Sequence, residues 1–165
     1  MAKVYQVINA ASPTTAAPVV VTSAAVIKTM IQLSTSANRE ARIVEWWWEG
    51  DAAAAATPGK IELLFHGGGA ATVTAYAAAD IKKYEPNAPA SAMTLGTANS
   101  GYTASAEGAV TTPSGVFAHL VPPTSGIYIQ YPLGREPEMA VSTFARLRNT
   151  LGSAVNVYAG VAWEE

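Results

Sequence analysis

The sequence predicts an all-β fold in which two antiparallel sheets pack as a jelly-roll-like β-sandwich, with an extended N-terminal arm. About eight short segments alternate apolar with polar residues, and turns rich in Gly, Pro, Ser and Asn separate them. No segment has a helical pattern strong enough to suggest a mixed fold. The strand count fits a jelly roll or another sandwich, and 165 residues fit one domain with a sizeable core.

The first 23 residues are expected to form the arm, and residues 24–165 the sandwich domain. Small and polar residues with two prolines fill most of the arm, and proline cannot donate a backbone hydrogen bond to a sheet. A short strand is possible at residues 4–8. We expect an arm of this kind to reach towards a partner.

The first clear strand is predicted at residues 26–34, where apolar and polar side chains alternate. A polar turn leads to a second strand at residues 41–50, and we expect the two strands to form a hairpin. Residues 51–59 are predicted to be a loop, because Thr-Pro-Gly at its end stops any helix that the preceding alanines could begin.

A third strand is predicted at residues 60–66, with residues 70–76 as its hairpin partner. Residues 77–93 are expected to be a loop with at most one helical turn, since two prolines prevent a long helix. Residues 94–113 are so rich in small residues that their strands cannot be placed. Further along, alternation predicts three more strands at residues 115–121, 126–131 and 139–149, and the clearest of all at residues 155–164.

The tryptophan strand at residues 41–50 is the best candidate for the centre of the core, because it holds three of the four tryptophans. Regular alternation places one set of side chains on one face, namely Val44, Trp46 and Trp48. The opposite face then carries Ile43, Glu45, Trp47 and Glu49. An indole is costly to leave in water, so we expect a loop or a second subunit to cover Trp47.

The composition argues against several classes of function. Charged residues make up 13% of the chain, and the net charge of −2 gives no basic surface for nucleic acid. No apolar run reaches the length of a membrane span, and the start of the chain lacks the pattern of a signal peptide. Because the chain has so few charged residues, we expect protein partners to cover part of the surface.

Residues 66–69, His-Gly-Gly-Gly, match the loop that forms an oxyanion hole in lipases and esterases. That fold also needs a Gly-x-Ser-x-Gly turn and crossover helices, and the sequence has neither. His66 and His119 could bind a metal or act as a general base, but Glu62 and Glu107 do not lie at ligand spacing from them. We therefore expect a glycine-rich turn, a structural histidine, no enzymatic activity, no cofactor and no metal.

Eight residues are predicted to form the core or an interface. They are Trp46, Trp47, Trp48, Tyr131, Phe144, Arg146, Arg148 and Trp163. The two arginines share a face with Phe144 and could pair with Glu136, Glu138 or a neighbouring chain, although a solvated outer face is the ordinary interpretation. The tryptophans could also form a platform for sugars, but consecutive residues point to opposite faces, which favours core and subunit contact.

Several stretches of the chain carry a resemblance to a known family. These are residues 29–33 with 42–46, residues 124–137, and residues 155–158 with 161–165, of which Gln130-Tyr-Pro-Leu-Gly-Arg-Glu136 is the most unusual string. Together they cover roughly half of the chain and resemble the capsid decoration, or cement, proteins of tailed bacteriophages. The middle of the chain and the triple tryptophan have no counterpart in this resemblance, and no catalytic residues are carried over.

The resemblance implies a jelly-roll subunit on the outside of an icosahedral phage head. Such a subunit would be made in the host cytoplasm, form a homotrimer at local threefold positions, and tie neighbouring major capsid proteins together. The alternative is a carbohydrate-binding or host-adhesion module on a virion, with the tryptophans and Tyr131 as its platform.

Overall fold

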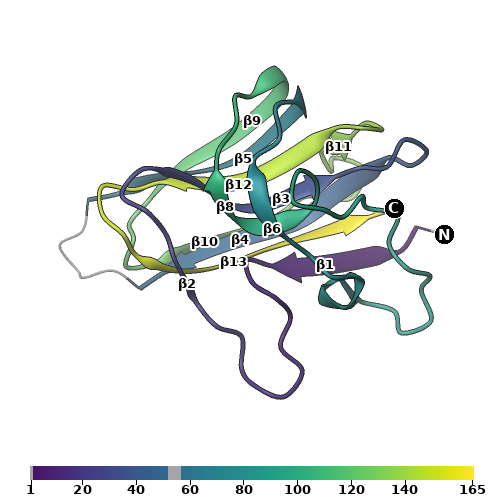
Figure 1. Cartoon of the computed structure of the whole chain (residues 1–165), viewed down its shortest axis with the longest axis horizontal. Helices are drawn as coiled ribbons and strands as arrows, with labels where there is room; N and C mark the ends of the chain where they lie inside the picture. Colours follow the sequence, from purple (N-terminus) through teal and green to yellow (C-terminus); the bar gives the residue numbers. More distant parts are fainter. Residues whose placement is uncertain (1, 52–56) are drawn as a thin grey trace.

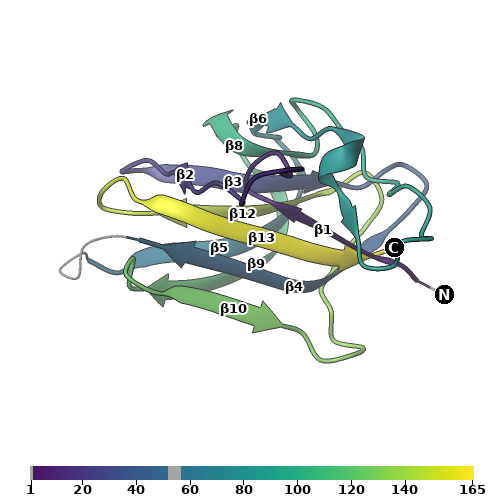
Figure 2. The same cartoon turned by 90° about the horizontal axis from the view of Figure 1, so that it is seen from below.

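Two antiparallel sheets pack face to face in the structure, a computed structural model that describes residues 2–51 and 57–165 (Figure 1). The predicted all-β sandwich is therefore confirmed. Part of the loop expected at residues 51–59 lies outside the described residues. Figure 2 shows the strands of one sheet side by side, and we call this layer sheet A and the other sheet B.

Eight strands form the frame of the sandwich. Sheet A has the order β1 (Val4–Ile8), β13 (Asn156–Glu164), β4 (Ala41–Gly50) and β10 (Gly126–Gln130). Sheet B has the order β3 (Ile27–Ser34), β12 (Phe144–Thr150), β5 (Gly59–Gly68) and β9 (Thr111–Val121). Along these eight strands the chain changes sheet at every step except from β5 to β9, which is the topology of a jelly roll.

Shorter elements extend this frame. Between β5 and β9 lie β6 (Thr72–Ala75), a 3-10 turn η1 (Ala78–Asp80), β7 (Lys82–Lys83) and β8 (Gly101–Ala106). Strands β8 and β6 continue sheet B beyond β3, and β7 pairs with β1. In addition, β2 (Val21–Thr22) pairs with β13, and β11 (Glu138–Met139) with β4. The single turn η1 agrees with the one helical turn expected there.

Both predicted hairpins are wrong. Strand β3 pairs with β12 and β8, whereas β4 pairs with β10, β11 and β13 in the other sheet. Strand β5 pairs with β12 and β9, and residues 72–75 pair with β8 instead. A polar turn is compatible with a hairpin or with a corner between sheets, and the jelly roll uses corners.

The predicted strand at residues 139–149 is interrupted. Its first residue belongs to β11, and β12 begins only at Phe144. Between them the chain turns, and Ser142 has a positive φ of 56°. Such a backbone conformation is incompatible with an extended strand.

The prediction that residues 1–23 form a separate arm is only partly correct, because this segment divides into a strand and a surface loop. Strand β1 lies between β13 and β7, and its Tyr5 and Val7 are buried in the core at 0% and 1% exposure. By contrast, residues 10–20 pass over the surface and loop away from the sheets in Figure 1. The sandwich domain therefore begins at β1 and not at residue 24.

A β-bulge changes the predicted faces of the tryptophan strand. Glu45 lies opposite Ala162 and Ile43 lies opposite Trp163, so Val44 is an extra residue in β4. The bulge reverses the alternation, because two residues occupy one position of the partner strand. As a result Ile43 and Trp46 both point into the core, although their positions in the chain predict opposite faces.

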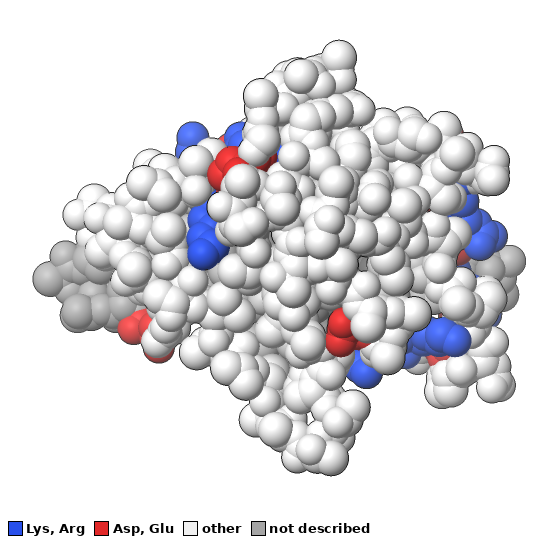
Figure 3. Space-filling view, in the orientation of Figure 1, with Lys and Arg blue, Asp and Glu red and all other residues white. Residues whose placement is uncertain are grey.

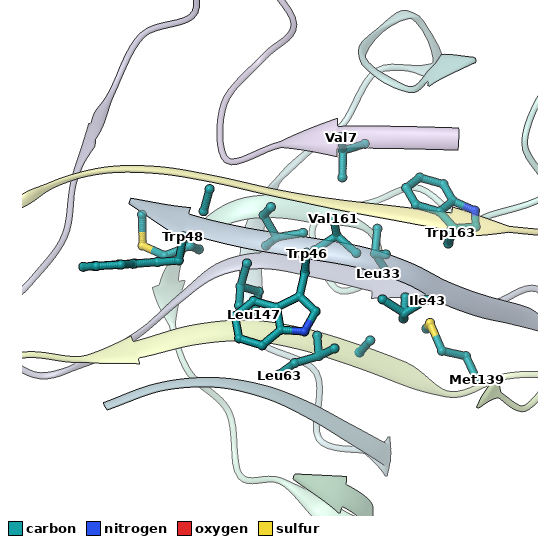
Figure 4. Close-up of a cluster of buried hydrophobic side chains, with 14 of the residues drawn as sticks. Val7, Leu33, Ile43, Trp46, Trp48, Leu63, Met139, Leu147, Val161 and Trp163 are labelled. Atoms are coloured by element: carbon teal, nitrogen blue, oxygen red, sulfur yellow. The ribbon is translucent and has the colours of Figure 1, made fainter. Parts of the chain in front are cut away.

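The core between the sheets is built around three tryptophans. Trp46, Trp48 and Trp163 have no exposed surface. Figure 4 shows Trp46 extending from sheet A towards Leu63 and Leu147 of sheet B. These three tryptophans are core residues, as the sequence predicts, and they are unavailable to a ligand or a partner.

Candidate interaction surfaces

Trp47 lies on the outer face of sheet A and is half-buried. It lies opposite Gly160 of β13, and a Cβ atom added to Gly160 would be only 2.0 Å from the indole carbon Cζ2. The indole therefore lies across the β13 backbone, in the space that a larger side chain would fill. The backbone at Gly160 therefore shields part of the Trp47 indole from water, a role that the sequence predicted for a loop or a second subunit.

A glutamate two residues before Trp47 accepts hydrogen bonds from two tyrosines on the outer side of sheet A. Tyr84 Oη donates a hydrogen bond of 2.7 Å to Glu45 Oε1, and Tyr128 Oη donates one to Glu45 Oε2. Tyr128 lies opposite Trp47 in the register of β10 with β4, and the two tyrosines are 51% and 58% exposed. We call Trp47, Tyr84, Tyr128 and Glu45 the outer aromatic face.

The pKa values of both phenols are raised in this environment. Burial and the hydrogen bond to Glu45 raise the pKa of Tyr84. The hydrogen bond to the same carboxylate is the main cause that raises the pKa of Tyr128. Both tyrosines are therefore donors at neutral pH, and no cation among the described residues pairs with Glu45.

Strand β9 forms the second surface. It is one edge strand of sheet B, and β6 is at the other edge. The eleven residues of β9 include no Asp, Glu, Lys or Arg, and ten of them are at least partly exposed. Val116, Phe117 and Leu120 are 53%, 38% and 77% exposed. Natural edge strands usually carry charges that prevent pairing with other chains, and Val116–Val121 also lacks proline and glycine. We call this strand the β9 edge.

Tyr131 does not join Trp47, so the platform predicted from the tryptophans and Tyr131 does not form. Its hydroxyl accepts a hydrogen bond of 3.2 Å from Trp46 Nε1. Its ring packs edge-on against Phe117, with 5.8 Å between ring centroids. Tyr131 therefore lies between β9 and the core.

Arg146 is completely buried, which agrees with its prediction as a core or interface residue and excludes the solvated outer face that was the ordinary interpretation. Its Nε donates to Gln32 Oε1 at 3.0 Å, and its Nη1 and Nη2 donate to the carbonyl oxygens of Glu107 and Gly69. The last two carbonyls belong to the segment between β5 and β9. That segment covers the middle of the outer face of sheet B, where both Arg146 and Gln32 donate hydrogen bonds to its carbonyl oxygens.

Arg148 and Phe144 lie on the same outer side of β12 and are half-buried. Arg148 Nε donates to Glu62 Oε1 at 2.6 Å, so its partner is neither Glu136 nor Glu138. The ring of Phe144 stacks on His66, with 5.2 Å between centroids. The predicted common face of these residues is therefore correct, but their predicted partners are not.

His66 is a buried structural residue. It is 1% exposed, its Nδ1 lies 2.7 Å from the carbonyl oxygen of Gly68, and β5 continues through Gly68. The glycines at 67 and 68 are thus part of a strand and do not form an oxyanion loop. His119 lies opposite Ile61, five positions along the strand or about 16 Å from His66, so the two histidines cannot share a metal ion.

The burial of His66 predicts a loss of stability in acid. Burial lowers the pKa of His66 to about 4, whereas the unfolded value is 6.5. Between these values the unfolded chain binds the proton and the folded chain does not, so stability falls as the pH decreases from 6.5 to 4. We expect this group to contribute at most about 3 kcal/mol of that loss.

Urea unfolding at pH 7 and pH 4.5 measures this contribution. His66→Gln removes the titrating group, so its loss of stability over the same interval should be smaller than that of the wild type. Equal losses in the two proteins would show that carboxylates alone cause the acid sensitivity.

Within residues 2–51 and 57–165, no group of three or more His, Asp or Glu side chains could hold a metal ion. In the same part of the chain, no helix has the length and apolar character needed to cross a membrane.

Sequence reasoning missed Tyr84, Tyr128 and Gly160. The alternation of residues 126–131 does place Tyr128 on the side opposite Ile127 and Ile129, which was a usable signal. Nothing in the sequence shows that β10 and the segment after β7 lie beside Glu45.

Comparisons with known proteins add little to this picture. No protein-family model matches the chain, and no curated protein sequence matches it. A structure of infectious bursal disease virus, Gt strain, is similar with 13% identity and a TM-score of 0.21 over 99% of this chain and 42% of that one. A score this low carries no argument about fold or function.

Proposed function

We propose that this chain is a virion structural protein, a decoration or cement subunit that binds the outer surface of a phage head and stabilises contacts between major capsid proteins. The resemblance of three stretches to such proteins motivates the proposal. The β9 edge is the structural observation that supports it best. A cement subunit needs adhesive surfaces and no reaction chemistry, because many weak contacts on a closed lattice add up by avidity.

The β9 edge suits attachment to another protein for two reasons. An edge strand offers a row of backbone donors and acceptors, and an extended segment of a partner can pair with them. The exposed side chains of Val116 and Leu120 add apolar contact on the outer face of sheet B. An uncharged edge of this length is an aggregation hazard unless a partner covers it.

The sparse distribution of charge is consistent with the same proposal. In Figure 3 the charged side chains are few and scattered over the visible face. Interface cores are depleted in charged residues relative to other protein surfaces. In the proposed assembly, homotrimers occupy the capsid exterior with the major capsid protein as their partner.

Leu120→Lys tests the role of the β9 edge. Leu120 is 77% exposed, so the substitution should leave the fold and its thermal stability nearly unchanged. We expect the charge to prevent strand pairing and to abolish co-sedimentation with empty heads of the phage that encodes the chain.

Light scattering would give the molar mass of the wild type, which for a trimer is three times 17.1 kDa.

Leu133→Lys is the matched control, because Leu133 is 95% exposed in the turn after β10. This control should bind heads as the wild type does. Normal binding by Leu120→Lys would remove the β9 edge from the proposal, and a wild type that never binds heads would refute the proposed function.

A further inference from the structure

The outer aromatic face is separate from the β9 edge and has a different chemistry. It lies on the broad side of sheet A and combines an indole, two phenols and a carboxylate that has no cation partner in the described chain. Ligand sites usually combine aromatic surface with a few convergent polar groups. We propose that this face binds a neutral sugar, with a pyranose ring stacked on Trp47 and its hydroxyls bonded to Glu45.

The indole of Trp47 is positioned for stacking. One side of the ring lies against the β13 backbone at Gly160, where an added Cβ would be 2.0 to 2.5 Å from three ring carbons. Trp47 is half-buried, so part of its surface still reaches solvent. A flat apolar surface supported in this way can pack against the C–H face of a pyranose without first losing conformational freedom.

Glu45 is held in place to accept hydrogen bonds. Each of its carboxylate oxygens already accepts one bond from a tyrosine, from Tyr84 and Tyr128 respectively. A carboxylate offers about four acceptor sites, so about two remain free for sugar hydroxyls. The tyrosine oxygens can also accept, which makes this face rich in acceptors and complementary to a ligand rich in hydroxyl donors.

The local charge selects against other ligands that stack on aromatic rings. Glu45 and Glu49 lie on the same outer side of β4 as Trp47. A nucleotide or an acidic sugar would bring a negative charge close to these carboxylates, which is unfavourable. A neutral pyranose avoids this repulsion.

A shallow depression adjoins Tyr128 and gives room for a second sugar ring. Its volume is about 490 Å³. The lining residues are Glu49, Gly50, Ser125, Gly126, Ile127 and Tyr128. An oligosaccharide stacked on Trp47 could therefore continue past Tyr128 into this depression.

The burial of the other tryptophans makes a direct experiment possible. Trp46, Trp48 and Trp163 are 0% exposed, so acrylamide quenching of fluorescence in the folded chain should report on Trp47. The full-length chain is first applied to an array of neutral and acidic glycans. The best neutral oligosaccharide is then titrated, and it is expected to protect the fluorescence from acrylamide.

Three variants test the predicted contacts. Trp47→Ala should lower the affinity on the array at least about tenfold, because the stacking surface is lost. Glu45→Gln should lower it by a smaller factor, since an amide keeps only one acceptor oxygen. Gly160→Ala should also weaken binding, because the new methyl group displaces the indole while the sugar-contacting residues remain.

Circular dichroism would show that each variant is folded, and Val26→Ala serves as a control because Val26 is 61% exposed just before β3 in sheet B. The proposal is overturned if no glycan binds the folded wild type, or if binding survives in Trp47→Ala. It is also overturned if Trp47 becomes protected merely by raising the protein concentration, since this face would then be a contact between copies of the chain. Capsid binding is measured separately, so failure of this proposal leaves the proposed capsid role standing.

Discussion

Replacing Trp46 by alanine is expected to lower the free energy of unfolding by about 3 to 5 kcal/mol, a large part of the roughly 5 to 15 kcal/mol that is typical of a domain. Trp46 is 0% exposed and lies between the two sheets. Its removal leaves a large cavity and deprives the Tyr131 hydroxyl of its hydrogen-bond donor. Urea unfolding followed by circular dichroism would measure the loss.

Trp47→Ala is the control for this experiment, because it removes the same side chain from the next position of β4. Trp47 is half-buried on the outer face, so we expect a loss of about 1 to 2 kcal/mol. If the two substitutions had equal effects, or if Trp47 were the more costly, the assignment of these residues to opposite faces would be wrong.

Replacing Arg146 by methionine is expected to cost at least about 3 kcal/mol, although methionine nearly fills the same volume. The substitution removes the donors to Gln32 and to the carbonyl oxygens of Gly69 and Glu107. A hydrogen bond from a charged donor contributes about 1.5 to 3 kcal/mol, and the carbonyl oxygens of Gly69 and Glu107 each lose one. By contrast, Gln32 Oε1 keeps its bond from Ala71 N. Hydrogen exchange should also become faster in the segment between β5 and β9, which these bonds hold against sheet B.

Arg42→Met is the matched control for the loss of an arginine. The Arg42 side chain is 51% exposed, and its pair with Glu138 spans 3.4 Å. Exposed pairs of this kind contribute at most about 1 kcal/mol. A loss for Arg146→Met no larger than that of Arg42→Met would mean that the covering segment does not depend on the buried guanidinium.

The fold class could be predicted because alternation is a local property. The alternating residues of β12 and β13 lie close together in the sequence, so their inner and outer faces can be assigned without knowing the neighbouring strands. The bulge at Val44 could not be predicted in this way. One extra residue leaves no repeating signal, yet it decides that Ile43 and Trp46 share the core.

The alternation of apolar and polar residues could not predict the environment of Arg146, for a different reason. Alternation correctly places Arg146 on the outer side of β12, where an arginine normally meets solvent. The segment that covers it is rich in Gly, Ala, Ser and Thr and has no regular period. Its position depends on tertiary contacts with Gln32 and Arg146 that no local rule anticipates.

The outer aromatic face shows the same limit. Glu45 is 39 residues from Tyr84 and 83 residues from Tyr128 in the sequence. The three meet because β4 lies in the same sheet as β10 and β7, which flank the strands β4, β13 and β1. Trp47 could be recognised as an outward indole from alternation alone. Its partners could be identified only after the strand order was known.

The segment between β5 and β9 gives the subunit two unlike sides. The segment covers the middle of sheet B and accepts hydrogen bonds from Gln32 and Arg146. On sheet A, no such segment of the described chain covers Trp47, which is half-buried. If such subunits attach to a symmetric shell by the β9 edge, symmetry would give the uncovered face around Trp47 the same orientation at every site. Many identically oriented copies would then make even weak individual contacts effective together.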